Sequence, residues 1–112
     1  MAVAKVLIHS QGNNEGSLKE AIDNYRPAMV FLISNPETIA SKVKSWIDEG
    51  NPQIGKHSRD VEYCEIINID PFNEDSVLQM VMAVQKAKTK SISLSAGRTL
   101  EFYAGLSGGT KL

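Results

Sequence analysis

The chain has little cysteine, no long apolar run and no excess of basic residues, and each shortage excludes a class of protein. A single cysteine, Cys64, excludes an internal disulfide and a metal site built from several cysteines. No apolar run approaches the roughly 20 residues of a membrane-spanning helix. The chain has 12 lysines and arginines and 13 acidic residues, which gives a net charge of −1. Proteins that bind long nucleic acids usually carry a basic surface. We therefore expect no membrane segment and no long nucleic acid as a partner.

The remaining bulk properties are those of one small domain. With 112 residues and 42% hydrophobic content, residues 1–112 can build a single core. The two histidines, His9 and His57, have no companions at metal-binding spacing, so we expect neither a metal nor a cofactor. Residues 1–5 lead straight into a strand pattern, so we expect no signal peptide and a cytoplasmic protein.

Apolar and amphipathic segments alternate along the chain. Buried strands are expected at residues 4–9, 28–33, 61–69 and 101–106. A first helix is predicted to begin at the capping box, with Ser17 as its N-cap. Arg26 and Pro27 are predicted to end this helix. A second helix is predicted from Asn35, its expected N-cap, to Gly50. This order predicts an α/β fold with three layers, in which a Rossmann-like parallel sheet carries helices on both faces.

The third helix is expected to begin at Asp70 and Pro71. Its apolar residues cover more than one stripe, which is typical of a helix with a second neighbour, and that neighbour could be another subunit; they are Val77, Leu78, Met80, Val81, Met82 and Val84. Residues 88–98 allow two interpretations. They predict either a short strand at 91–95 that turns at Gly97, or a frayed helix end followed by a loop.

Two polar loops follow the first and last expected strands. The last strand breaks into Ser107, Gly108, Gly109, Thr110 and Lys111. Paired glycines let backbone N–H groups approach an anion closely, and the hydroxyls and the ammonium add donors, so this loop indicates a phosphate cradle. The first strand breaks into Ser10, Gln11, Gly12, Asn13 and Asn14. In a parallel sheet the carboxyl ends of the strands share one edge, where ligands bind.

The residues 106–112, Leu-Ser-Gly-Gly-Thr-Lys-Leu, together with the loop after the first strand, resemble the CARF domain, the CRISPR-associated Rossmann-fold sensor of type III systems. The resemblance covers the order and spacing of essentially the whole chain. It implies a homodimer that binds a cyclic oligoadenylate, expected to be cyclic tetraadenylate (cA4), and activates an attached effector in antiviral defence. It also implies that Ser10, Gln11 and residues 107–111 contact the ligand. Family members continue beyond this loop, so the chain could also be a portion of a longer effector protein.

Several alternatives remain open on the sequence alone. The resemblance also allows a ring nuclease that cleaves its ligand, in which Ser10 would position the ligand and Lys111 would stabilise charge, although no general base is evident. A flavodoxin-like or receiver-like regulatory domain without nucleotide is a third possibility. Residues 107–111 could be a plain glycine turn, and Ser34 and Asn35 serve equally as a helix cap or as neighbours of the ligand.

Three further features have both an ordinary and a functional interpretation. His9 ends a strand and is expected to be a satisfied histidine of the core or rim. A cluster of Lys56, His57 and Arg59 is either a lid over an anion or a solvated loop. Cys64 is expected to be an inert, packed thiol.

Overall fold

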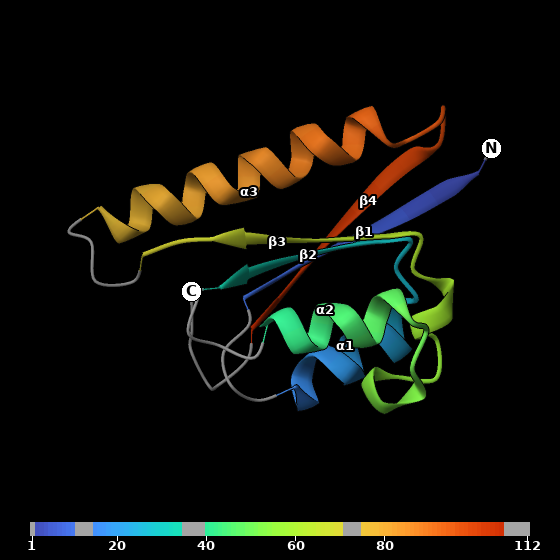
Figure 1. Cartoon of the computed structure of the whole chain (residues 1–112). Coiled ribbons are helices and arrows are strands. Elements are labelled where there is room, and N and C mark those ends of the chain that lie inside the picture. The colour runs from blue at the N-terminus through green and yellow to red at the C-terminus, as the bar shows by residue number, and fades with distance from the viewer. Residues whose placement is uncertain (1, 11–14, 35–39, 71–74, 107–112) are drawn as a thin grey trace.

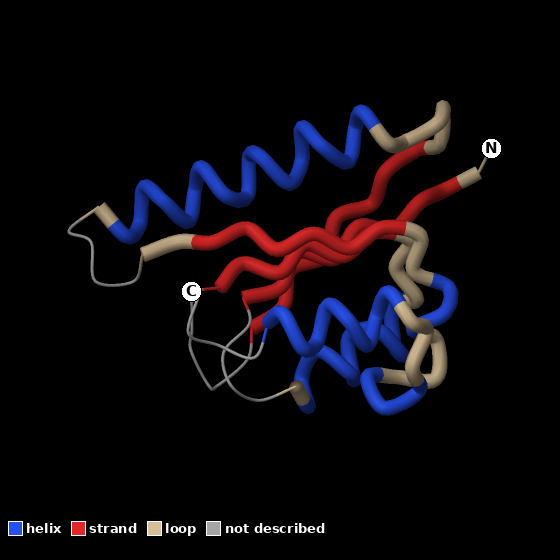
Figure 2. The backbone as a smooth tube through the Cα atoms, in the orientation of Figure 1, coloured by secondary structure: helices blue, strands red, loops and turns tan. Residues whose placement is uncertain are grey.

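A computed structural model gives the structure of the chain and describes residues 2–10, 15–34, 40–70 and 75–106. Its centre is a sheet of four parallel strands, and helices cover both faces (Figures 1 and 2). The strands are β1 (Val3–Ser10), β2 (Met29–Ser34), β3 (Tyr63–Asn68) and β4 (Thr99–Leu106). The helices are α1 (Gly16–Tyr25), α2 (Ala40–Asp48) and α3 (Ser76–Ser93). The expected three-layer, Rossmann-like α/β fold is therefore confirmed.

Alternate side chains of each strand enter two separate cores. Leu7, Val30 and Leu32 pack with α1 and α2 on one face, and Val6, Ile8 and Phe31 pack with α3 on the other. Because successive residues of a strand point to opposite faces, strands buried on both sides must be apolar throughout. All six residues of β2 are buried, which explains why the strands read as continuous apolar runs.

The strand order is β3-β2-β1-β4, so β1 lies inside the sheet between β2 and β4. The chain builds outward from β1 to β2 and then to β3, and it crosses to the other side of β1 for β4. The register aligns Ser10 with Ile33 of β2 and with Leu106 of β4. The ends of these three strands therefore lie level at one edge, called here the carboxyl edge.

Two expected helix starts are wrong. The capping box placed the N-cap of the first helix at Ser17, but helical hydrogen bonding already begins at the carbonyl of Glu15, which accepts the N–H of Lys19 at 2.9 Å. Ser17 therefore lies inside the first turn. The third helix begins at Ser76 rather than at Asp70. The N–H of Asp70 donates instead to Oε1 of Gln79 at 2.7 Å, which ties the end of the β3 segment to the helix.

The structure decides between the two interpretations of residues 88–98. The helix α3 continues to Ser93, and the hydroxyl of Ser91 donates to the carbonyl of Lys88 within it. A turn follows, in which the N–H of Arg98 donates to the carbonyl of Ser95 and Gly97 has a φ of +80°. The helix-and-loop interpretation is therefore correct.

Candidate functional site

The sheet reverses its direction of growth between β1 and β4. In open parallel sheets this reversal leaves a crevice outside the carboxyl ends of the two strands, and ligands bind there. Ser10 ends β1 and is paired with Leu106, the last residue of β4. Both polar loops of the sequence therefore start from adjacent, hydrogen-bonded strands at this point.

The structure describes only two of the expected ligand contacts. Ser10 is half-buried at the end of β1, and Ser34, which ends β2, is 4% exposed. The other expected contacts lie outside the described residues; they are Gln11, Gly12, Asn13, Asn35, Ser107, Gly108, Gly109, Thr110 and Lys111. The strands that precede each of these segments end at the expected edge.

Buried polar atoms without a partner gather at the same edge. Among the described residues, the buried side-chain atoms that make no hydrogen bond are both ring nitrogens of His9 and the hydroxyl oxygens of Ser17 and Ser34. His9 and Ser34 lie near the ends of β1 and β2, and Ser17 lies in the first turn of α1. A buried polar group left unpaired costs about 1–3 kcal/mol, and such groups in native proteins call for an explanation. Their clustering marks this edge as a place for a polar ligand or for water.

His9 is the most deeply buried of these groups, with none of its surface exposed. Its ring lies against Gly105, its register partner on β4. A Cβ atom at position 105 would lie 2.4 Å from Cδ2 of the imidazole, closer than van der Waals contact allows. Burial lowers the pKa of His9 from 6.5 to about 4; the nearby backbone of Ser10 opposes this in part, without reaching hydrogen-bonding geometry. The imidazole is therefore neutral at pH 7, with one donor nitrogen and one acceptor nitrogen.

A hollow of about 190 Å³ opens beside His9 and beneath α1. It is lined by His9, Ser17, Glu20, Ala21, Asn24, Tyr25 and Gly105. Tyr25 stacks on Tyr103 of β4, with ring centroids 4.3 Å apart, and so holds the end of α1 against the sheet. This hollow, called here the α1 hollow, joins two of the unpartnered residues in one space.

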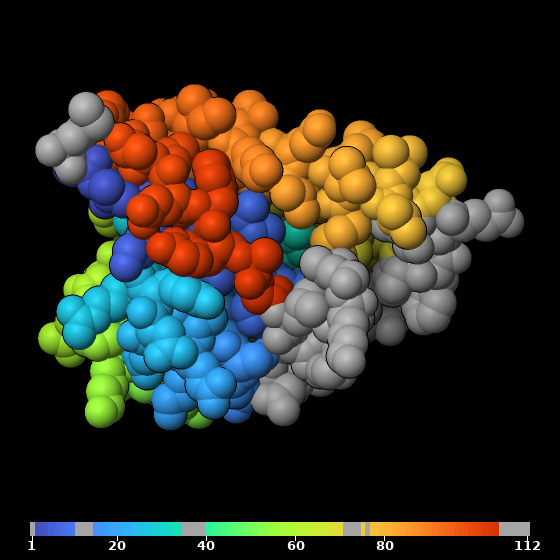
Figure 3. All heavy atoms as spheres, turned by 180° about the vertical axis from the view of Figure 1, so that it is seen from behind, coloured from blue at the N-terminus to red at the C-terminus, as the bar shows by residue number. Residues whose placement is uncertain are grey.

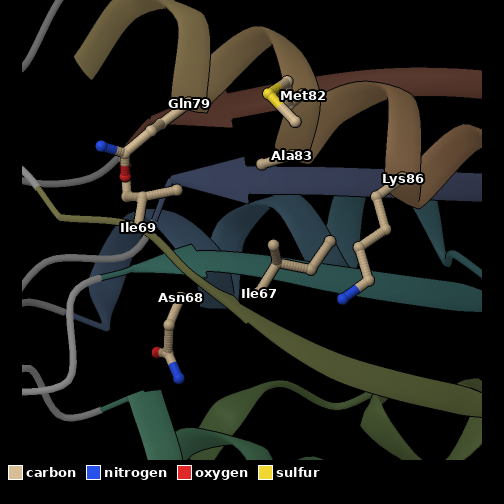
Figure 4. A pocket seen from close by; sticks show the side chains of 7 residues that line it. All are labelled: Ile67, Asn68, Ile69, Gln79, Met82, Ala83 and Lys86. Carbon is tan, nitrogen blue, oxygen red and sulfur yellow. The ribbon is translucent and has the colours of Figure 1, made fainter. Parts of the chain in front are cut away.

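A second hollow of about 320 Å³ lies on the opposite face, between α3 and the end of β3 (Figure 4). The helix contributes Gln79, Met82, Ala83 and Lys86, and the strand side contributes Ile67, Asn68 and Ile69. Its described walls hold one charged side chain, that of Lys86, and they are mainly apolar. This hollow adjoins the exposed face of α3 rather than the switch point between β1 and β4.

The structure decides between the two interpretations of Lys56, His57 and Arg59 in favour of the solvated loop. Residues 51–60 follow α2, which leads the chain back from the carboxyl edge, and they lie at the opposite edge of the sheet (Figure 1). They form two short 3-10 helices, Pro52–Ile54 and Ser58–Asp60. The backbone N–H of His57 donates to Oδ1 of Asp23 at 3.2 Å, which fixes the position of the loop. Lys56, His57 and Arg59 thus belong to a solvated loop.

Sequence reasoning missed most of the α1 hollow. His9 is buried as expected, but its ring nitrogens have no partner among the described residues. The sequence predicts Ser17 as a helix cap and indicates no role for Gly105. The available signal was a histidine in an otherwise apolar strand, but the glycine that makes room for it is 96 positions away and becomes its neighbour only when β4 pairs with β1.

Other kinds of site find no support in the described parts of the chain. No group of three or more histidine, cysteine, aspartate or glutamate residues there could hold a metal ion. Burial raises the pKa of the Cys64 thiol to about 12, which agrees with the expected inert, packed cysteine. No helix in the described ranges is long and apolar enough to cross a membrane.

Comparisons of the chain with protein-family models, with curated proteins and with solved structures found no match.

Proposed function

We propose that the chain is a CARF-type sensor domain that binds a cyclic oligoadenylate, with cA4 as the expected ring, at the carboxyl edge of its sheet. The observation that carries the proposal is the pairing of Ser10 with Leu106. This pairing starts the two polar loops of the sequence from adjacent strands at a topological switch point, where α/β sheets bind nucleotides. In the proposal, backbone amides of residues 107–111 hold phosphate, and the loop after β1 contacts the ribose.

The unpartnered polar atoms at the same edge support this assignment. Ser34 ends the strand next to β1, and its buried hydroxyl makes no hydrogen bond among the described residues. A ligand that lies across the ends of β4, β1 and β2 would offer a partner to such groups. The proposal therefore explains why the fold keeps buried polar atoms whose missing hydrogen bonds would otherwise lower its stability.

The proposed sensor acts as a homodimer, and the exposed face of α3 supports this part. The side chains of Val77, Leu78, Val81 and Met82 are 78%, 55%, 48% and 61% exposed. These four residues are called here the α3 patch. The opposite side of the helix packs on the sheet through Ala83 and Ala87, so this packing leaves the patch uncovered by the described residues. It lies in the half of α3 nearest the carboxyl edge (Figure 1), the edge at which the ligand is proposed to bind.

The test is calorimetric titration of the purified chain with cyclic oligoadenylates of three, four and six units and with linear tetraadenylate. We expect the tightest binding for cA4. Gly108→Val should abolish binding, because a β-branched side chain blocks the approach of phosphate to the backbone. Gly97→Ala is the matched control. Gly97 lies in the turn before β4, its φ is +80°, and no atom lies within 4 Å of an added Cβ, so this variant should lose some stability and keep its affinity.

Two results would overturn the proposal. One is the absence of binding to any oligoadenylate by the folded wild-type chain. The other is unchanged affinity in Gly108→Val, which would remove residues 107–111 from the site. Chromatography of cA4 after incubation with excess protein shows separately whether the ring is cleaved.

A further inference from the structure

We propose that the outer edge of β3 binds an extended, acidic peptide segment of a partner protein. The segment would pair with β3 as a fifth strand and place an apolar side chain and a carboxylate in the hollow between α3 and the end of β3 (Figure 4). This hollow is called here the α3 hollow. The inference goes beyond the proposed function, because the ligand site uses neither this strand edge nor this hollow.

The backbone of β3 is paired on one side only. In the order β3-β2-β1-β4, the strand β2 is its one neighbour in the described sheet. The N–H groups of Tyr63 and Ile69 donate to carbonyls at the two ends of β2, at 3.2 and 2.8 Å. Backbone groups of successive residues point to alternate sides of a strand, so those of Ile66 and Asn68 point away from β2. Ile66 is half-buried and Asn68 is exposed, which leaves this end of the edge accessible.

The edge of β3 lacks the features that usually prevent pairing with another chain. Proteins commonly block an exposed edge with lysine, with proline or with a bulge. The strand contains neither lysine nor proline, and its register with β2 runs without a bulge. Its single charged side chain, that of Glu65, is held on the strand by the hydroxyl of Tyr63, which donates to it. An edge of this kind binds extended segments through main-chain hydrogen bonds.

The α3 hollow lies directly beside this edge. Every second side chain of an added strand would point toward α3, on the face that carries Ile67 and Ile69. The hollow measures about 320 Å³, and its accessible walls include half-buried Ile69 and exposed Met82. It therefore has room for an apolar side chain. Of its walls only Met82 also belongs to the α3 patch, so the peptide and the proposed dimer use largely different residues.

Charge indicates that the peptide is acidic. Lys86 is exposed, its side chain is directed from α3 toward the sheet (Figure 4), and it forms no ion pair with a described residue. The helix carries two further lysines, Lys88 and Lys90, and no acidic residue. Lys90 lies 5.9 Å from the ring centroid of Tyr63, at the other end of β3. A carboxylate on the added strand would gain a partner in Lys86, whereas a basic peptide would be repelled.

The test is a nuclear magnetic resonance titration of the full chain with the blocked heptapeptide Val-Thr-Val-Thr-Glu-Thr-Val, whose valines and glutamate share one face. At millimolar peptide, the amide resonances of Ile66 and Asn68 should shift along a saturable curve. The amide of Phe102, on the opposite edge strand, should stay in place. Replacing the glutamate by glutamine should weaken binding about two- to fivefold, the usual effect of an exposed ion pair. Replacing two adjacent central residues by proline should abolish binding, because proline has no N–H.

Two lysine variants test the assignment of the carboxylate to the α3 hollow. Lys86→Gln should weaken binding of the glutamate peptide about two- to fivefold and make it equal to the glutamine peptide. Lys88→Gln is the matched control and should leave the affinity unchanged. Lys88 lies on the other side of the helix, 5.6 Å from the ring centroid of Phe102 of β4. Figure 3, seen from behind, shows α3 beside β4 on that side.

Three results would overturn the proposal. The first is that the amides of Ile66 and Asn68 do not shift, or that they shift equally with the proline peptide. The second is equal weakening of binding by both lysine variants. The third is a shift of these amides with the concentration of the chain alone, because a second copy would then occupy the edge. Titration with cA4 tests the proposed sensor separately, so either proposal can fail while the other stands.

Discussion

At the scale of single residues, the neutral imidazole of His9 opposes folding in acid. Its pKa is about 4 in the folded chain and 6.5 when exposed, so the unfolded chain binds more protons between these values. Stability should therefore be fully present above pH 6.5 and decline as the pH falls toward 4. The difference corresponds to about 3 kcal/mol at most.

Urea unfolding at pH 7.5 and pH 5 measures this decline. His9→Gln removes the titrating group, keeps a donor and an acceptor, and should flatten the profile over this range. His57 is present in both proteins and so cancels in the comparison. A variant that loses as much stability in acid as the wild type would show that other groups cause the decline.

Gly105 offers a second test at this scale, because its missing Cβ makes room for the imidazole. Gly105→Ala should destabilise the fold by about 1–3 kcal/mol, the usual cost of forcing atoms into a packed site. His9→Ala should relieve the crowding, so the two changes together should cost less than the sum of the single changes. A thermodynamic double-mutant cycle measures this coupling, and purely additive costs would contradict the contact.

Sequence reasoning predicts single residues well where the cause is local. The stop at Arg26 and Pro27 is confirmed: Arg26 is left-handed with a φ of 49°, and its N–H donates to the carbonyl of Ile22. The role of Ser17 was wrong because a capping box fixes only the neighbourhood of a helix start. That the helix begins two residues earlier depends on how it packs over the sheet.

At the scale of elements, α3 has two apolar stripes on opposite sides. One packs on the sheet through Ala83 and Ala87, and the other is the α3 patch with Ile92, which is 63% exposed. A helix that is apolar on both sides is typical of a second interface. The apolar width of this helix was visible in the sequence, but which stripe faces the sheet depends on the tertiary fold.

A charge placed in the α3 patch should separate the proposed dimer. Met82→Glu should shift the chain from dimer to monomer in sedimentation at micromolar concentration, because an unpaired charge is costly in an apolar interface. The wild-type monomer has a mass of 12.3 kDa. The fold should survive, since Met82 is 61% exposed.

Gln53→Glu is the control for this experiment. It adds the same charge to an exposed residue on the 3-10 helix at the opposite edge, and it should leave the dimer intact. A wild-type chain that is monomeric both with and without ligand would contradict the dimer.

At the scale of the whole molecule, strand order decides where the site forms. The sequence predicted alternating strands and helices and the edge at which the strands before the polar loops end. It did not supply the order β3-β2-β1-β4, because pairing between strands depends on contacts across the whole chain rather than on local pattern. That order makes the ends of β1 and β4 neighbours.

A ligand that binds this edge only in the folded chain should stabilise the fold against unfolding. At a free concentration one hundred times its dissociation constant, cA4 should raise the free energy of unfolding by about 2.7 kcal/mol. Thermal unfolding with and without cA4 measures this gain. Gly108→Val should show none of it, and an equal gain with linear tetraadenylate would argue against recognition of the ring.

The pairing of β1 with β4 also has a consequence for folding during synthesis. Val3 is aligned with Thr99, and Ser10 with Leu106, so nearly the whole chain separates the two strands. During synthesis the edge of β1 that pairs with β4 therefore stays unpaired until β4, the last of the four strands, leaves the ribosome. Contacts so distant in sequence form slowly, and an apolar strand with an open edge attracts other strands. The step that completes the proposed site is thus also the step at which a nascent chain is most exposed to misassembly.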